Sequence, residues 1–112
     1  MHLLVIVLNS EELLDEVLEI FVEVGITGAT ILDSEGMGKT LAYQMQIFAG
    51  LKKSMKISNY NKTIFSIVQD DKILEEAIFL FEKNIDFDTP GTGILFVIPV
   101  TFAKGISQEE LG

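Results

Sequence analysis

The segment that decides the fold is GITGATILDSEGMGKT, residues 25–40. Its first residue, Gly25, follows a helical pattern and is a natural C-terminal stop for a helix. The β-branched residues after it predict a strand over 27–34, and Gly36-Met37-Gly38 predicts a tight turn at the end of that strand. Lys39 then places a cation beside the backbone N–H groups that such a turn exposes.

A second glycine turn, Gly91-Thr92-Gly93, precedes another strongly apolar segment. If the fold brings the two turns together, their N–H groups form a cradle for an anion or a nucleotide phosphate. The alternative is that both are ordinary turns at strand ends, because short glycine motifs often occur without a ligand.

The residues on the N-terminal side of this segment predict a strand and a helix. Residues 2–8 are apolar at nearly every position, which favours a strand with two buried faces. Asn9 is expected to cap the following helix, with Glu12 completing a capping box. The expected buried stripe of this helix comprises Leu13, Leu14, Val17, Leu18, Phe21 and Val22. The opposite face is acidic, as expected of a solvated surface.

The second half of the chain repeats the pattern of strand, helix and strand. A strand is expected over 62–69, and Asp70 or Asp71 caps the next helix. The buried stripe expected there comprises Ile73, Leu74, Ala77, Ile78, Leu80 and Phe81. A last strand is expected over 93–101, and Pro99 predicts that this strand lies at a sheet edge or bends there.

The order strand-helix-strand-strand-helix-strand predicts an α+β, ferredoxin-like sandwich, a βαββαβ antiparallel sheet with two helices on one face, within one domain over 1–112. The first and last strands are apolar on both faces, so the face without helices needs a cover. Self-association into a closed cyclic oligomer, with Val5 and Val7 or their neighbours covered by another subunit, meets that need.

The segment 39–61 is too long for an idle loop in a compact domain. Its apolar residues and its lysines, Lys52, Lys53 and Lys56, suit either a partly helical excursion packed on the body or a mobile arm for a partner. The polar residues 102–112 predict a loose C-terminal tail.

Composition excludes several classes of function. The net charge of −9 disfavours nucleic acid as a partner, and no segment is long and apolar enough for membrane insertion. The chain has no cysteine, and with no convergent metal ligands we expect no metal site. The single histidine, His2, gives no basis for a catalytic triad. We therefore expect a cytoplasmic protein that is not an enzyme.

The residues quoted above resemble the PII family of nitrogen-regulatory signalling proteins. The resemblance rests on the segments 24–30, 36–39, 70–71 and 91–97, in this order along nearly the whole chain. It implies a homotrimer whose sheets face inward, with adenine nucleotides bound between subunits. Carried over by position, the resemblance implies that Thr30 and Ile67 line the base, that Gly36, Gly38 and Lys39 form the loop base, and that Gly91, Thr92 and Gly93 form the second turn.

The sequence departs from the family where cations are expected to hold phosphates. Ile94, Gly105 and Ser107 replace family cations, with Lys104 nearby, and Asn61 replaces another beside Lys62. Each lost charge-assisted hydrogen bond costs roughly 1.5–3 kcal/mol. ATP affinity is therefore expected to be weakened, which favours AMP or ADP as ligand. Phe48 stands where many members carry a modified tyrosine, so control by uridylylation is not expected.

These observations predict a homotrimeric regulatory protein that binds a small ligand at its subunit interfaces and signals through residues 39–61. The target implied by the resemblance is a membrane transporter or an enzyme. The alternative is a non-catalytic structural or partner-binding trimer without nucleotide, closer to the CutA-like relatives of this fold.

Overall fold

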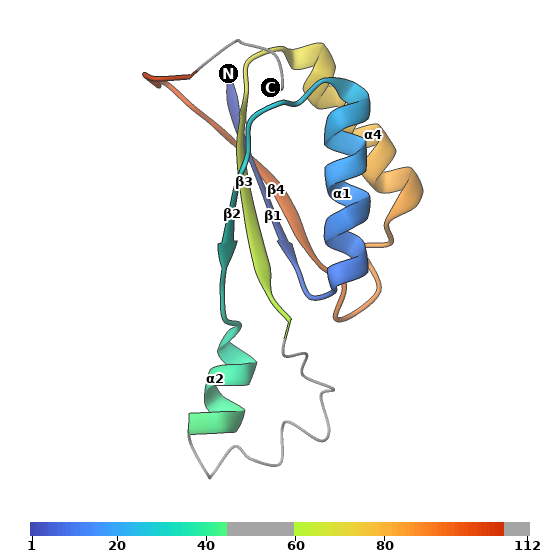
Figure 1. The fold of residues 1–112 in the computed structure, drawn as a ribbon, viewed down its shortest axis with the longest axis vertical. Coiled ribbons are helices and arrows are strands. Elements are labelled where there is room, and N and C mark those ends of the chain that lie inside the picture. The colour runs from blue at the N-terminus through green and yellow to red at the C-terminus, as the bar shows by residue number, and fades with distance from the viewer. Residues whose placement is uncertain (45–59, 107–112) are drawn as a thin grey trace.

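Four strands form one antiparallel sheet in the order β2-β3-β1-β4, and two long helices lie against one of its faces (Figure 1). The structure, a computed structural model, describes residues 1–44 and 60–106. The elements are β1 (His2–Leu8), α1 (Glu11–Val24), β2 (Thr30–Asp33), α2 (Met37–Gln44), β3 (Lys62–Val68), α4 (Asp71–Asn84) and β4 (Gly93–Pro99). The α+β, ferredoxin-like sandwich predicted from the sequence is confirmed, and α2 is an addition that follows β2.

Some expectations fall on residues 45–59 and 107–112, which lie outside the described residues. One is whether the 39–61 segment is packed on the body or is a mobile arm. The others are the alignment of Phe48 with the family's modified tyrosine, the replacement of a family cation by Ser107, and most of the loose tail expected over 102–112.

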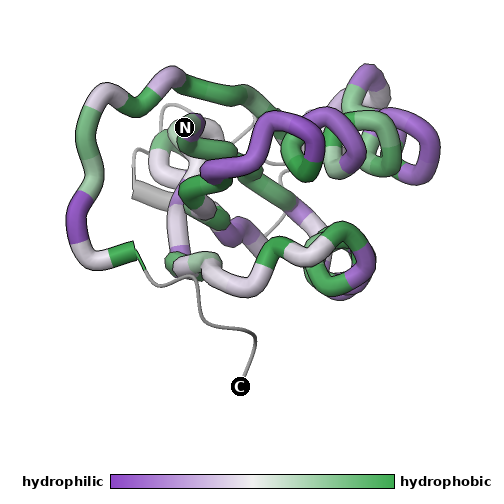
Figure 2. The backbone as a smooth tube through the Cα atoms, turned by 90° about the horizontal axis from the view of Figure 1, so that it is seen from above, coloured by the Kyte–Doolittle hydropathy of each residue, from purple (hydrophilic) through white to green (hydrophobic). Residues whose placement is uncertain are grey.

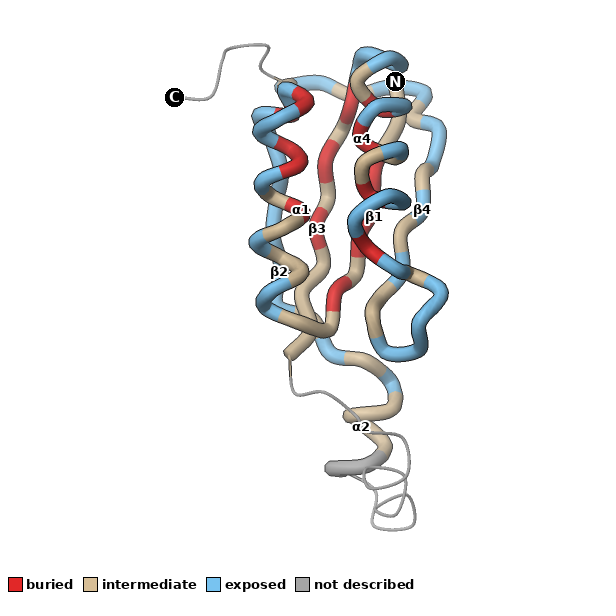
Figure 3. The backbone as a smooth tube through the Cα atoms, turned by 90° about the vertical axis from the view of Figure 1, so that its right-hand side faces the viewer, coloured by how far each residue is buried: buried red, intermediate tan, exposed pale blue. Residues whose placement is uncertain are grey.

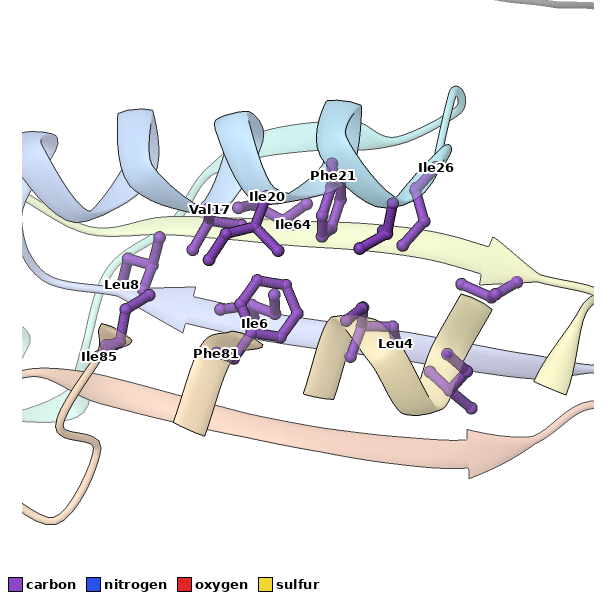
Figure 4. Close-up of a cluster of buried hydrophobic side chains, with 14 residues drawn as sticks. Leu4, Ile6, Leu8, Val17, Ile20, Phe21, Ile26, Ile64, Phe81 and Ile85 are labelled. Atoms are coloured by element: carbon purple, nitrogen blue, oxygen red, sulfur yellow. The ribbon is translucent and has the colours of Figure 1, made fainter. Parts of the chain in front are cut away.

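The hydrophobic core lies between α1, α4 and the central strands β1 and β3. Leu4, Ile6 and Leu8 alternate on the helix side of β1 and are fully buried. The rings of Phe21 and Phe81, from the two helices, approach to 5.9 Å between centroids at 60° (Figure 4). Each such side chain contributes about 1.5–3 kcal/mol when buried, so this row fixes both helices on the sheet.

Burial follows the layers of the fold. The buried residues lie along β1 and β3 and on the inner turns of α1 and α4, whereas β2 and most of β4 are less covered (Figure 3). Both long helices alternate between hydrophilic and hydrophobic residues, as expected for elements with one buried face (Figure 2).

The ends of the helices confirm two predictions and correct two. Gly25 ends α1 in the left-handed conformation with φ 91°, and Asp70 caps α4 by accepting from the Lys72 backbone N–H. The expected cap Asn9 is wrong, because the N-cap of α1 is Ser10 and the Asn9 side chain binds another segment. Val22 was expected in the buried stripe but is exposed.

The second strand is shorter than the predicted 27–34. It begins only at Thr30, and in the preceding segment the carbonyl of Gly28 accepts a hydrogen bond from the Ser66 side chain. The other strands agree with their predicted bounds to within one or two residues, and β4 is the edge strand that Pro99 predicted.

The face of the sheet opposite the helices is apolar and is only partly covered within one chain, since Val5 at its centre is 4% exposed but the edge strands β2 and β4 carry exposed apolar residues. On β4, Ile94, Phe96 and Ile98 are 54%, 41% and 43% exposed. The pairing register places the following residues on the same face: Leu3, Val5, Val7, Thr30, Leu32, Thr63, Phe65 and Ile67. The prediction of strands with two apolar faces is thus confirmed, and such a continuous patch is typical of an interaction surface.

Candidate ligand-binding site

Four chain segments meet at one end of the sheet. Leu8, the last residue of β1, is opposite Lys62 on β3 and Gly93 on β4, and Asp33 on β2 is also opposite Lys62. The end of β2 therefore lies at the same end of the sheet as the start of β4, and α2 leaves the body there (Figure 1). Both predicted glycine turns lie at this end.

The first predicted turn is the start of a helix. Gly36 precedes α2 and accepts a 3.2 Å hydrogen bond from the Thr40 N–H, whereas Gly38 lies inside the first turn of α2. The prediction of a tight Gly-Met-Gly turn is therefore wrong. The N–H groups exposed here are those of a helix N-terminus, which also favours an anion.

The cation at this position is already paired. Lys39 Nζ lies 3.7 Å from a carboxylate oxygen of Glu35, and the Thr40 hydroxyl donates to the other oxygen of Glu35 at 2.5 Å. An anionic ligand that bound Lys39 would have to compete with Glu35.

The second turn is held by its own backbone geometry. Gly91 has φ 88°, which favours glycine, and the Thr92 N–H donates to the Thr89 carbonyl at 3.2 Å. Gly93 has φ 147°, and a Cβ on it would lie 2.0 Å from the Val7 carbonyl oxygen. Gly93 is thus required by the close approach of β4 to β1.

The loop before this turn is stabilised by Asp86. Its carboxylate accepts hydrogen bonds from the Thr89 hydroxyl at 2.7 Å and the Asp88 N–H at 3.0 Å. These bonds, the Thr89 hydroxyl first, lower the pKa of Asp86 below its ordinary value.

A chain of neutral side chains joins the two sides of this sheet end. Ser34, just after β2, donates its hydroxyl to the side-chain oxygen of Asn61, just before β3. Asn61 Nδ2 donates to Asn9 Oδ1 at 2.8 Å, and Asn9 Nδ2 donates to the Gly91 carbonyl at 3.2 Å. We call Ser34, Asn61, Asn9 and Gly91 the polar relay.

Sequence reasoning missed the polar relay. Asn9 was interpreted as a helix cap, and Asn61 only as the loss of a cation. The four residues come together through the strand register, which local spacing does not encode.

The second lysine at this end of the sheet, Lys62, is also paired with a carboxylate. Lys62 forms an ion pair and hydrogen bond with Asp33, and this hydrogen bond raises the pKa of Lys62. Its ammonium also lies 5.7 Å from the centre of the Tyr60 ring. Both lysines that the structure describes here, Lys39 and Lys62, therefore have a carboxylate partner.

Two expected ligand residues lie away from the glycine turns within one chain. Thr30 is opposite Phe65 on the uncovered face, about 10 Å along β2 from Asp33. Ile67 is opposite Leu3, about 17 Å from Leu8 along β1. Within one chain, therefore, the same end of the sheet carries Gly36, Lys39 and Gly91–Gly93. Thr30 and Ile67 lie further along the strands, away from that end.

Other chemistry is sparse in the described part of the chain. No group of three or more potential metal ligands occurs within residues 1–44 and 60–106, and no helix there is long and apolar enough to cross a membrane. An open cavity of about 530 Å³ lies between the end of α4, the loop that follows it and Leu95. His2 Nδ1 lies 3.4 Å from an Asp71 carboxylate oxygen, at the far end of the sheet.

Comparison with known proteins gives concordant results. The family model described as Nitrogen regulatory protein P-II matches residues 1–110. A nitrogen regulatory protein P-II from Azospirillum brasilense is 29% identical over 99 residues, which cover 88% of this chain and 86% of that protein. The crystal structure of a PII-like signaling protein from Thermus thermophilus superposes with a TM-score of 0.57 at 18% identity, covering 87% of this chain and 82% of that one.

Proposed function

We propose that this chain, which belongs to the nitrogen regulatory protein P-II family, is a homotrimeric regulator. In this proposal the trimer binds a small ligand at its subunit interfaces. The observation that carries the proposal is that both glycine segments lie at the same end of the sheet, the end from which α2 leaves. A ligand there contacts the base of the 39–61 segment, through which the protein acts on a membrane transporter or an enzyme. Its site of action is the cytoplasm, and no catalytic step is part of the proposal.

The uncovered sheet face supports the trimer. Ile94, Phe96 and Ile98 form an exposed apolar row on β4, beside the apolar residues of β1 and β3. Burying such surface contributes about 25 cal/mol per Å², so three copies that pack these faces together gain stability. Closed cyclic symmetry is the usual outcome for homo-oligomers.

The ligand is an adenine nucleotide, with AMP or ADP favoured over ATP. Gly36, Gly38 and Lys39 of one copy would approach its phosphate from one side and Gly91–Gly93 of a neighbouring copy from the other, because the two segments lie at opposite edges of the sheet within one chain. Thr30 and Ile67 of a neighbouring copy would line the base, since they are remote from the turns within one chain. A triphosphate needs several cations, whereas Lys39 and Lys62 are already paired with carboxylates.

Thermal denaturation with AMP, ADP and ATP tests this proposal. A ligand that binds only the native state raises the melting temperature as its concentration increases. We expect AMP or ADP to raise it more than ATP at equal concentration. Lys39→Ala should reduce the shift, whereas Lys72→Ala, at the far end of the sheet, should not. No shift with any nucleotide would contradict nucleotide binding.

The pairing of both lysines also favours a second candidate, a structural or partner-binding trimer without nucleotide. A stable trimer with no thermal shift from AMP, ADP or ATP would support this candidate.

A further inference from the structure

The geometry points to Asn61 and Asn9 as positioning residues that couple the base of the 35–60 segment to the Gly91–Gly93 turn. Through them, a change at one glycine segment alters the other within a single subunit. The functional meaning of this coupling rests on the proposed ligand site, but the coupling itself can be tested in the ligand-free protein.

The two glycine segments need such a link because they lie at opposite edges of the sheet. β2 and β4 are the edge strands, and β3 and β1 lie between them. Three strand spacings separate the edges by about 14 Å. The polar relay crosses this distance at the sheet end, from Ser34 after β2 to Gly91 before β4.

Asn61 also closes the base of the 35–60 segment. Its carbonyl accepts a 3.1 Å hydrogen bond from the Ser34 N–H, while its side chain accepts from the Ser34 hydroxyl and donates to Asn9. The two chain ends of this segment are thus tied through the same residue that contacts Asn9. A shift of this base would therefore change the geometry of the bond to Asn9.

Asn9 holds the second turn at two points. Its side chain donates to the Gly91 carbonyl, and its backbone N–H donates to the Thr92 carbonyl at 3.3 Å. Two hydrogen bonds therefore tie the position of the turn to that of Asn9.

The polar relay has a fixed direction. It ends at the Gly91 carbonyl, which can only accept a hydrogen bond, so Asn9 must present its N–H₂ group to Gly91 and its oxygen to Asn61. Asn61 must then present its own N–H₂ group to Asn9 and its oxygen to Ser34. If either side-chain amide is flipped so that its oxygen and its N–H₂ group exchange places, two acceptors or two donors face each other along the polar relay. The orientation of one amide therefore fixes that of the other.

This direction supplies a sharp test. Asn61→Asp keeps the size of the side chain and the acceptor for Ser34, but removes the donor to Asn9. To satisfy the new carboxylate, Asn9 would have to flip, and its oxygen would then face the Gly91 carbonyl. Asn9→Asp cuts the link to Gly91 directly while it still accepts from Asn61. Asn84→Asp is the matched control, because it removes a 2.8 Å hydrogen bond to the Leu80 carbonyl at the exposed end of α4.

The measurement is amide hydrogen exchange in the ligand-free protein. We expect Asn61→Asp and Asn9→Asp each to speed exchange of the backbone amides at positions 9 and 92, which donate to the Thr92 and Thr89 carbonyls, by about ten-fold, the effect of one lost hydrogen bond. Asn84→Asp should leave these amides unchanged. Should Asn61→Asp fail to fold, Asn61→Ala breaks the same link without adding a charge and is judged by the same amides.

The inference is overturned if the amides at positions 9 and 92 exchange as slowly in Asn61→Asp, or in Asn61→Ala in its place, as they do in Asn84→Asp. ADP added to the unaltered protein separates this result from failure of the proposed function. If ADP does not bind but Asn61→Asp speeds exchange at the turn, the positioning role stands and nucleotide binding fails. If ADP binds and the exchange is unchanged, only the positioning role fails.

Discussion

The Ser66 hydroxyl donates a 2.6 Å hydrogen bond to the Gly28 carbonyl, so the interior of β3 is tied to the loop that precedes β2. Ser66 is only 3% exposed and faces the helices among apolar neighbours. Buried hydroxyls need such a partner, because an unsatisfied polar group in the core is costly. This bond fixes the path of the chain through the segment that carries the family resemblance.

Ser66→Ala should therefore lower the free energy of unfolding by about 1–3 kcal/mol, since it leaves the Gly28 carbonyl without this donor. Urea denaturation provides the measurement. Ser10→Ala is the matched control, because the Ser10 hydroxyl makes no capping hydrogen bond to α1. Equal losses for the two variants would show that the bond to Gly28 adds nothing.

Gly93 should tolerate no side chain. The Cβ of Gly93→Ala would meet the Val7 carbonyl oxygen at 2.0 Å, so β4 would have to shift away from β1. We expect a loss of more than about 2 kcal/mol, or failure to fold. Gly28→Ala is the control, because a Cβ there meets nothing within 4 Å. Circular dichroism during thermal denaturation compares the two, and similar melting temperatures would contradict this account of β4.

The assembly should depend on the uncovered sheet face rather than on the helices. Phe96→Glu places a charge in the apolar face and should dissociate the trimer, because a buried unpaired carboxylate is costly. Phe79→Glu makes the same change on α4, where Phe79 is 62% exposed, and should leave the trimer intact. Light scattering at micromolar concentration measures both. An intact trimer in Phe96→Glu would place the interface elsewhere.

Asp86 should contribute to stability at neutral pH and lose that contribution in acid. Its pKa in the folded protein is lowered, mainly by the Thr89 hydroxyl, from the ordinary value of 3.8. The stabilisation is therefore complete above the ordinary pKa and is lost as the pH falls through the lower, folded pKa. Thr89→Val should raise the pKa of Asp86 toward 3.8, which an NMR titration of its carboxyl group can detect. An unchanged pKa would exclude Thr89 as the main cause.

Local sequence patterns predicted the parts of the fold that local physics determines. Gly25 ended its helix because glycine adopts the left-handed conformation at low cost, and Asp70 capped α4 with its own side chain. Asn9 failed as a cap because a long-range partner, Gly91, competes for its side chain. Gly38 failed as a turn residue because α2 begins one residue earlier.

The candidate site was predictable only in outline. The two glycine segments could be identified from sequence, and the order of the strands places them at one end of the sheet. The carboxylate partner of Lys39, and the link from Asn61 to Asn9, depend on how side chains meet after folding. Asn61 looked like the loss of a cation, yet the structure shows an amide whose donor and acceptor both have partners.

Native mass spectrometry in the presence of ADP tests the central claim most directly, since it reports subunit number and bound ligand in one measurement. The account predicts a species of three 12.4 kDa chains that carries ADP and loses it on Lys39→Ala while remaining a trimer. A monomer at micromolar concentration, with or without ADP, would contradict it.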